Sequence, residues 1–234
     1  SPTRGFSAGG SSTPGTISNK HIDYITISTL GNSAEFGEKI TTNWQVSGCA
    51  NAIRGLIMGG RLTPTEVNTI EFITMASLGN ALDFGDLSRI SRYQMANASP
   101  TRAVFAGGDT AAPADTKIIQ HVNIQSLGNA ETFGELKTGR GSHTACSNST
   151  RGLIAGGQTP DPNLNSIEFV TIASTGNGTD FGDLNNAADY LGSCASSTRG
   201  TFAGGQTPTK LNVIEFVTIA TTGNAIDFGD LTVA

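Results

Sequence analysis

Strand-sized runs of apolar and β-branched residues recur along the whole chain, separated by stretches rich in Gly, Asn, Ser and Thr. In one representative stretch, residues 151–155 (Arg-Gly-Leu-Ile-Ala) lead into a double glycine, and residues 167–172 (Ile-Glu-Phe-Val-Thr-Ile) follow after a polar loop. Runs of this composition, bounded by turn residues, predict β-strands. The double glycine ends the first strand because both residues tolerate positive φ.

Two further strands are predicted downstream in the same stretch. After a Gly-Asn turn, residues 181–184 (Phe-Gly-Asp-Leu) predict a short outer strand, on which Asp180 and Asp183 face outward and discourage pairing with other chains. Residues 190–195 (Tyr-Leu-Gly-Ser-Cys-Ala) predict a strand of small residues, which suits a place where sheets converge near an axis. One unit therefore contains four strands.

This unit occurs five times. The arginines that open it are separated by 50, 48, 49 and 48 residues: Arg4, Arg54, Arg102, Arg151 and Arg199. A period near 48 residues is that of one four-stranded propeller blade. The sequence therefore predicts an all-β fold, a five-bladed β-propeller that forms a single domain over residues 1–234. Its repeats are residues 1–51, 52–99, 100–148, 149–196 and 197–234.

The first and last repeats predict how the ring closes. The sequence contains five copies of three strands but only four copies of the small-residue strand. Propellers avoid an open sheet edge by completing one blade with a strand from the other end of the chain. We therefore expect residues 1–234 to be part of a longer chain that supplies the inner strand of the first blade.

Composition and charge narrow the class of protein. Only 14% of the residues are charged, the net charge is -5, and the basic residues are spread over the repeats without a cluster, which disfavours nucleic-acid binding. No apolar stretch is long enough to span a membrane. The three cysteines, Cys49, Cys146 and Cys194, occupy equivalent places, with Asn97 in the fourth, and predict small buried thiols; a metal site is the lesser alternative. No cofactor is expected.

The order of strands within the unit resembles the kelch repeat, and the resemblance covers all five repeats. Its strongest element is the glycine pair, which stands at positions 9–10, 59–60, 107–108, 156–157 and 204–205, whereas the kelch Tyr and Trp partners are mostly absent. Phrases such as residues 169–177 and 179–184 are similar to repeats of structural and tail proteins of marine bacteriophages. This resemblance implies a structural or adhesion module of a virion or tail, located on the phage particle or otherwise extracellular or at a cell surface. The implied partners are other virion or tail proteins or a host surface glycan or protein, with the chain part of a homo-oligomer.

The repeats differ most in their loops. The loops after the double glycines and the connections from outer to inner strands vary in length and charge, and in an up-and-down blade both sets emerge on one face. A rigid scaffold with one variable face is typical of a binding surface, although unselected drift would give the same variation. The candidate binding residues on this variable loop face are Trp44, Arg61, Arg92, Tyr93, His143 and Tyr190.

The invariant arginine column predicts a structural ring. A guanidinium can bridge to acidic side chains of nearby outer strands or to turn carbonyls, and a ring that gathers an anion is the alternative. His121 replaces the Phe or Tyr of other repeats and is expected to be a half-buried imidazole rather than a ligand.

No catalytic constellation is recognisable. The histidines come from different blades, and the Asp-Phe-Gly phrases recur as outer-strand turns, with Ca²⁺ binding by Asp83 and Asp86 a minor alternative. We therefore expect no enzymatic activity. The competing function is a cellular kelch-like protein-protein interaction domain.

Overall fold

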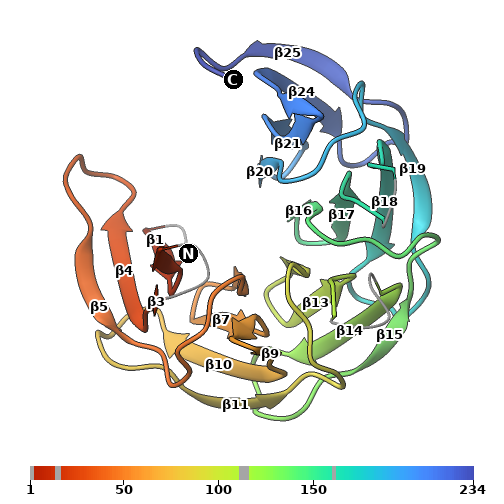
Figure 1. Cartoon of the computed structure of the whole chain (residues 1–234). Helices are drawn as coiled ribbons and strands as arrows, with labels where there is room; N and C mark the ends of the chain where they lie inside the picture. Colours follow the sequence, from red (N-terminus) through yellow and green to blue (C-terminus); the bar gives the residue numbers. More distant parts are fainter. Residues whose placement is uncertain (1–2, 14–16, 111–115, 160–161) are drawn as a thin grey trace.

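Five small antiparallel sheets lie around a common centre in the computed structural model, which describes residues 3–13, 17–110, 116–159 and 162–234 (Figure 1). Every regular element in these residues is a β-strand, and none of them forms a helix long and apolar enough to cross a lipid bilayer. The predicted all-β, five-bladed β-propeller is confirmed.

The blades follow one another along the chain, and each runs from its innermost to its outermost strand. Blade 1 consists of β1 (Arg4–Ala8), β4 (His21–Thr26) and β5 (Ala34–Glu38). Blade 2 consists of β6 (Ser47–Ala50), β7 (Arg54–Met58), β10 (Thr69–Thr74) and β11 (Leu82–Asp86). Blade 3 consists of β12 (Met95–Ala98), β13 (Arg102–Ala106), β14 (Ile118–Asn123) and β15 (Glu131–Glu135).

The last two blades and three hairpins complete the fold. Blade 4 consists of β16 (Thr144–Ser147), β17 (Arg151–Ala155), β18 (Ser166–Thr171) and β19 (Thr179–Asp183). Blade 5 consists of β20 (Gly192–Ala195), β21 (Arg199–Ala203), β24 (Val213–Thr218) and β25 (Ile226–Asp230). The hairpins pair β2 (Ser11–Thr13) with β3 (Ile17–Ser18), β8 (Arg61–Leu62) with β9 (Thr65–Glu66), and β22 (Gln206–Thr207) with β23 (Thr209–Lys210). Parts of the variable loops, residues 14–16, 111–115 and 160–161, lie outside the described residues.

Strand boundaries shift slightly from those predicted. The inner strand of blade 5 begins at Gly192 rather than at Tyr190, because Tyr190 has φ 54 and this left-handed backbone cannot continue a strand. The outer strand β19 begins at Thr179, before Phe181, and pairs with β18 through a register shift between Ile167 and Glu168.

The hydrophobic core lies between the blades. Four clusters of buried side chains fill the four successive interfaces, each combining one blade with the next. Between blades 2 and 3, for example, Ile70 and Phe84 pack with Val122 and Ile124, all at most 4% exposed. Blades 2, 3 and 4 therefore bury one face against the blade before and the other against the blade after, as the apolar alternation of their strands requires.

Hydrogen bonds reinforce every interface in the same way. The Arg54 guanidinium donates to the carbonyl of Ile124 in the next blade at 2.8 Å, and Arg4, Arg102 and Arg151 make the equivalent bond. In return, the Asn129 side chain accepts from the amide of Asp86 at 3.0 Å, and the amide of Gly128 donates to Phe84. Arg4, Arg54, Arg102 and Arg151 thus bond to backbone carbonyls of the next blade.

In blades 1 to 4, the glycine after the outer-strand phenylalanine has a packing explanation. The Gly-Asn turn of the following blade approaches so closely that a Cβ on Gly37, Gly85, Gly134 or Gly182 would overlap the carbonyl oxygen of the turn glycine. Only a residue without a side chain fits there.

The cysteine prediction is only partly correct. Cys146 is buried and Cys49 half-buried, and burial raises the pKa of both thiols to about 12. Cys194 is exposed, so the prediction of a buried thiol is wrong there. Its strand, β20, belongs to blade 5, and within the part of the chain that the structure describes no further inner strand covers it. His121 is more deeply buried than the half-buried imidazole expected: its side chain is 9% exposed and packs edge-on against Phe133, as the Phe of other blades does.

Candidate functional site

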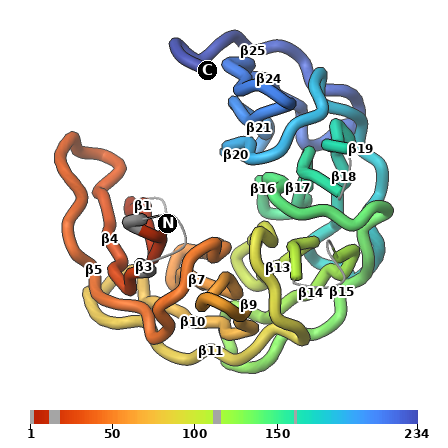
Figure 2. Tube along the Cα trace, viewed as in Figure 1, coloured from red at the N-terminus to blue at the C-terminus, as the bar shows by residue number. Residues whose placement is uncertain are grey.

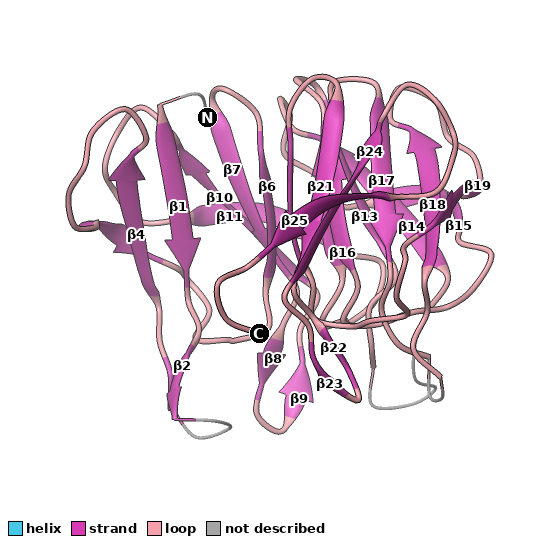
Figure 3. Ribbon diagram, turned by 90° about the horizontal axis from the view of Figure 1, so that it is seen from above, coloured by secondary structure: helices cyan, strands magenta, loops and turns pink. Residues whose placement is uncertain are grey.

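The two faces of the propeller differ. The hairpins and the connections from outer to inner strands emerge on one face, while the short turns that precede the arginines and the Gly-Asn turns lie on the other (Figure 3). The first face is the variable loop face. Because its loops are carried by blades with a shared architecture, differences between the repeats are displayed there.

The loops of this face are held to each other by backbone pairing. Trp44 and Arg61 form an isolated antiparallel bridge, with N–H to O distances of 3.1 and 2.8 Å, and Arg92 pairs with Asp109 at 3.0 and 2.7 Å. The same bridge joins two further pairs of equivalent residues, Gly141 with Gln158 and Asp189 with Gln206. Each connection is thus fixed to the loop that follows the next double glycine.

One residue after this bridge, four connections turn inward and meet. Gln45, Tyr93, Ser142 and Tyr190 stand at equivalent positions and all have positive φ, between 52° and 57°. The side-chain amide of Gln45 donates to the Tyr93 hydroxyl, and the rings of Tyr93 and Tyr190 meet edge to face with centroids 5.9 Å apart. The backbone amide of Tyr190 donates to the backbone carbonyl of Ser142 at 2.9 Å. Residues from four different connections can touch only where the connections converge. We refer to these four residues as the axial cluster.

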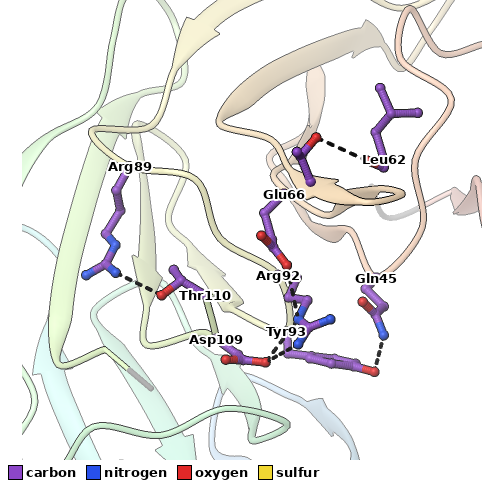
Figure 4. A network of polar contacts seen from close by, with 9 residues as sticks. Gln45, Leu62, Glu66, Arg89, Arg92, Tyr93, Asp109 and Thr110 are labelled. Carbon is purple, nitrogen blue, oxygen red and sulfur yellow. Dashed lines mark hydrogen bonds and ion pairs between the residues drawn. The ribbon is translucent and has the colours of Figure 1, made fainter. Parts of the chain in front are cut away.

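A charged network borders the axial cluster (Figure 4). Arg92 donates twice to one carboxylate oxygen of Asp109, at 2.9 and 2.7 Å, and lies 3.7 Å from a carboxylate oxygen of Glu66. Its guanidinium is also 5.6 Å from the centre of the Tyr93 ring. These contacts fix the orientation of both Arg92 and Tyr93.

The hydroxyl of Tyr93 stays protonated over the whole physiological range. Burial first, and then the hydrogen bond with Tyr190, raise the pKa of Tyr93 to about 12. A neutral phenol beside an exposed ring offers an apolar surface with a polar edge, which suits stacking on a sugar or anchoring a partner.

The predicted binding residues occupy different depths. Tyr190 is exposed, at 51%, while Trp44, Arg61, Arg92 and Tyr93 are half-buried. The structure brings Arg92, Tyr93 and Tyr190 together; Trp44 and Arg61 form a neighbouring pair.

His143 lies beneath the variable loop face, not on it, because its side chain is 1% exposed. Burial, and then the positive charge of Arg140, lower the pKa of His143 to about 3, so the imidazole is neutral near pH 7. Arg140 is itself fully buried and pairs with Glu168 at 2.6 Å. These three residues form a structural cluster.

Sequence reasoning missed Gln45 and Ser142, and with them the axial cluster. The four equivalent residues share neither size nor charge, so no pattern of residue type reveals them. The usable signal was spacing, since each stands nine residues after the phenylalanine of its outer strand.

Within the described residues, no group of three His, Cys, Asp or Glu side chains is close enough to hold a metal ion. No protein-family model and no curated protein matches this chain.

Proposed function

We propose that the protein is a non-enzymatic structural or adhesion module of a bacteriophage virion or tail, which binds through its variable loop face. The observation that carries this proposal is the exposed Tyr190 ring, held by Tyr93 where the loop connections converge. The phage setting rests on the similarity of the repeat phrases to those of phage structural proteins.

The ligand that best suits the axial cluster is a surface glycan. The apolar face of a sugar stacks on an aromatic ring, and hydroxyls beside it need polar partners. Gln45 and the Arg92–Asp109 pair supply such partners next to the rings. A neighbouring subunit of the particle would use the same residues as an anchor, since buried Tyr and Arg side chains dominate many interfaces.

A binding experiment tests the role of the face. The purified chain is screened against bacterial surface glycans, and the affinity for each glycan bound is measured by calorimetry. Tyr190→Ala should weaken binding about tenfold, because it removes the stacking surface. Leu127→Ala is the matched control: Leu127 is also exposed, at 58%, but belongs to a Gly-Asn turn on the opposite face. Equal affinities of both variants and the parent chain would contradict the proposal.

The particle setting needs a separate test. Antibodies against the chain should decorate purified phage particles in electron micrographs, at a fixed place on the capsid or tail. Labelling confined to the unassembled fraction of an infected culture would reject the virion assignment and leave the binding face intact.

A further inference from the structure

The two ends of the arc face an opening (Figures 1 and 2), and each end exposes a surface that the other blades bury. On blade 5, Phe228 is 59% exposed, whereas the equivalent phenylalanines of blades 1 to 4 are at most 3% exposed. Leu231 is 38% exposed, against 2% for the leucines at the same position in blades 2 to 4. This is the side of a blade that packs against the next blade.

Blade 1 exposes the opposite side. Ile25 is 47% exposed and Ile27 57%, while the residues at these two positions in blades 2 to 5 are at most 4% exposed. In those blades the positions pack against the preceding blade. The two ends therefore carry the two complementary halves of one blade-to-blade interface.

Polar groups at the ends show the same complementarity. Within the described part of the chain, the Arg199 guanidinium makes no hydrogen bond, although it lies over the Phe216 ring as the equivalent Arg151 lies over Phe169. Between blades 4 and 5, the backbone amide of Asp183 donates to the side chain of Asn224. Within the described residues, the equivalent groups at the two ends, the amide of Asp230 and the side chain of Asn32, make no such bond. A Cβ on Gly229 would touch nothing within 4 Å, unlike one on Gly182.

The inner edge of blade 1 is incomplete as well. An apolar hollow of about 380 Å³ lies beside β1, between Phe6 and Ala8 on one side and Val46 and Cys49 on the other. In every other blade an inner strand of small residues pairs at this edge.

We propose that the opening is occupied by a further blade of this same repeat. Its outer strand would cover Ile25 and Ile27, its middle strand would cover Phe228, and Arg199 would reach its backbone carbonyl. All four interfaces in the structure are built from these groups in this order, so only a blade of this repeat matches both ends at once. A small-residue strand after that blade would then fill the hollow beside β1.

An extended protein tests this proposal. Residues 232–234 are replaced by a copy of residues 185–231 followed by a copy of residues 185–198, which adds one blade and one inner strand. In a control extension, the copies of Phe228 and Leu231 in the added blade are both replaced by Asp, so that its outer strand cannot cover blade 1.

The decisive readout is a change in mutational sensitivity. Gly182→Ala should lower the melting temperature of both the natural and the extended chain. Gly229→Ala should cost several degrees more in the extended chain, because the added Gly-Asn turn now approaches it. Ile25→Thr should likewise become costly only in the extended chain, whereas Val170→Thr, at the equivalent buried position, should be costly in both.

Three outcomes would overturn the proposal. If Gly229→Ala or Ile25→Thr has the same effect in the natural, extended and control proteins, the added blade does not occupy the opening. If Gly229→Ala is already as costly as Gly182→Ala in the natural chain, the five blades close on each other directly. If sedimentation shows that the natural chain self-associates, and Phe228→Asp dissociates it, a second copy is the occupant.

Discussion

At the scale of single residues, the repeat provides its own comparison for each side chain. His143 occupies the position of Val46, Gln94 and Leu191 in the other connections, and it is the only titratable group among the four. Its side chain is buried, the positive charge of Arg140 acts on it, and it has a backbone hydrogen bond with Ala106. The site therefore disfavours a second positive charge.

His143 should make the protein sensitive to acid. Its pKa is about 3 in the folded protein and about 6.5 in the unfolded chain, so between these values the unfolded state binds more protons. Stability is therefore full above pH 6.5 and falls as the pH decreases toward 3, by about 1.4 kcal/mol per pH unit. His143→Gln, which places the residue of the equivalent position Gln94 there, should reduce the loss of unfolding free energy between pH 7 and pH 5 by about 2 kcal/mol.

Urea denaturation at the two pH values measures this effect. His21→Gln, at an exposed position, is the control for replacing a histidine elsewhere in the chain. An undiminished pH dependence in His143→Gln would show that another group is responsible.

At the scale of the element, turn chemistry decides where strands stop. The double glycines have φ values between 59° and 104° in all five blades, as the sequence predicted from the Gly-Gly pairs. The ends of the inner strands could not be predicted in the same way. Tyr93 and Tyr190 adopt positive φ although they are not glycine, and their rings pack against each other in the axial cluster, a contact that the sequence does not show.

Replacing a glycine of the pair should therefore be far more damaging than changing the loop beside it. Gly156 has φ 64, and a Cβ there would lie 2.6 Å from the Ala188 carbonyl oxygen. Gly156→Val should cost about 3 kcal/mol of unfolding free energy. Gln158→Ala should change it by about 0.5 kcal/mol or less, because the bridge of Gln158 with Gly141 uses the backbone only. Similar melting temperatures for the two variants would argue against the strand boundary.

At the scale of the whole molecule, the sequence predicted the architecture because each repeat carries the same strand and turn signals. A period of that size leaves few other arrangements. The sequence could not show which groups join one blade to the next. The carboxylate of Glu71 accepts from the amides of Ile40 and Thr41 of the preceding connection, and Gln120 bonds the Ser88 amide in the same way. Such contacts become visible only when residues about 30 positions apart are placed in space.

The contribution of these interface bonds can be measured with two equivalent arginines. Arg151 donates to the carbonyls of Ile219 and Ala220 in the next blade, at 2.9 and 3.0 Å, whereas the Arg199 side chain has no such acceptor within the described residues. Both guanidiniums lie over a phenylalanine of their own blade, at 4.4 and 4.6 Å from the ring centre, so replacement by Met removes the same ring contact in each case. Arg151→Met should therefore lower the unfolding free energy by about 1–3 kcal/mol more than Arg199→Met, the cost of losing the charge-assisted bonds between blades.

Because blades stabilise one another only through their neighbours, the loss at Arg151 should also lower the cooperativity of urea unfolding, seen as a smaller m-value, as blade 5 separates earlier from the rest. Equal losses in the two variants would mean that apolar packing alone holds the blades together.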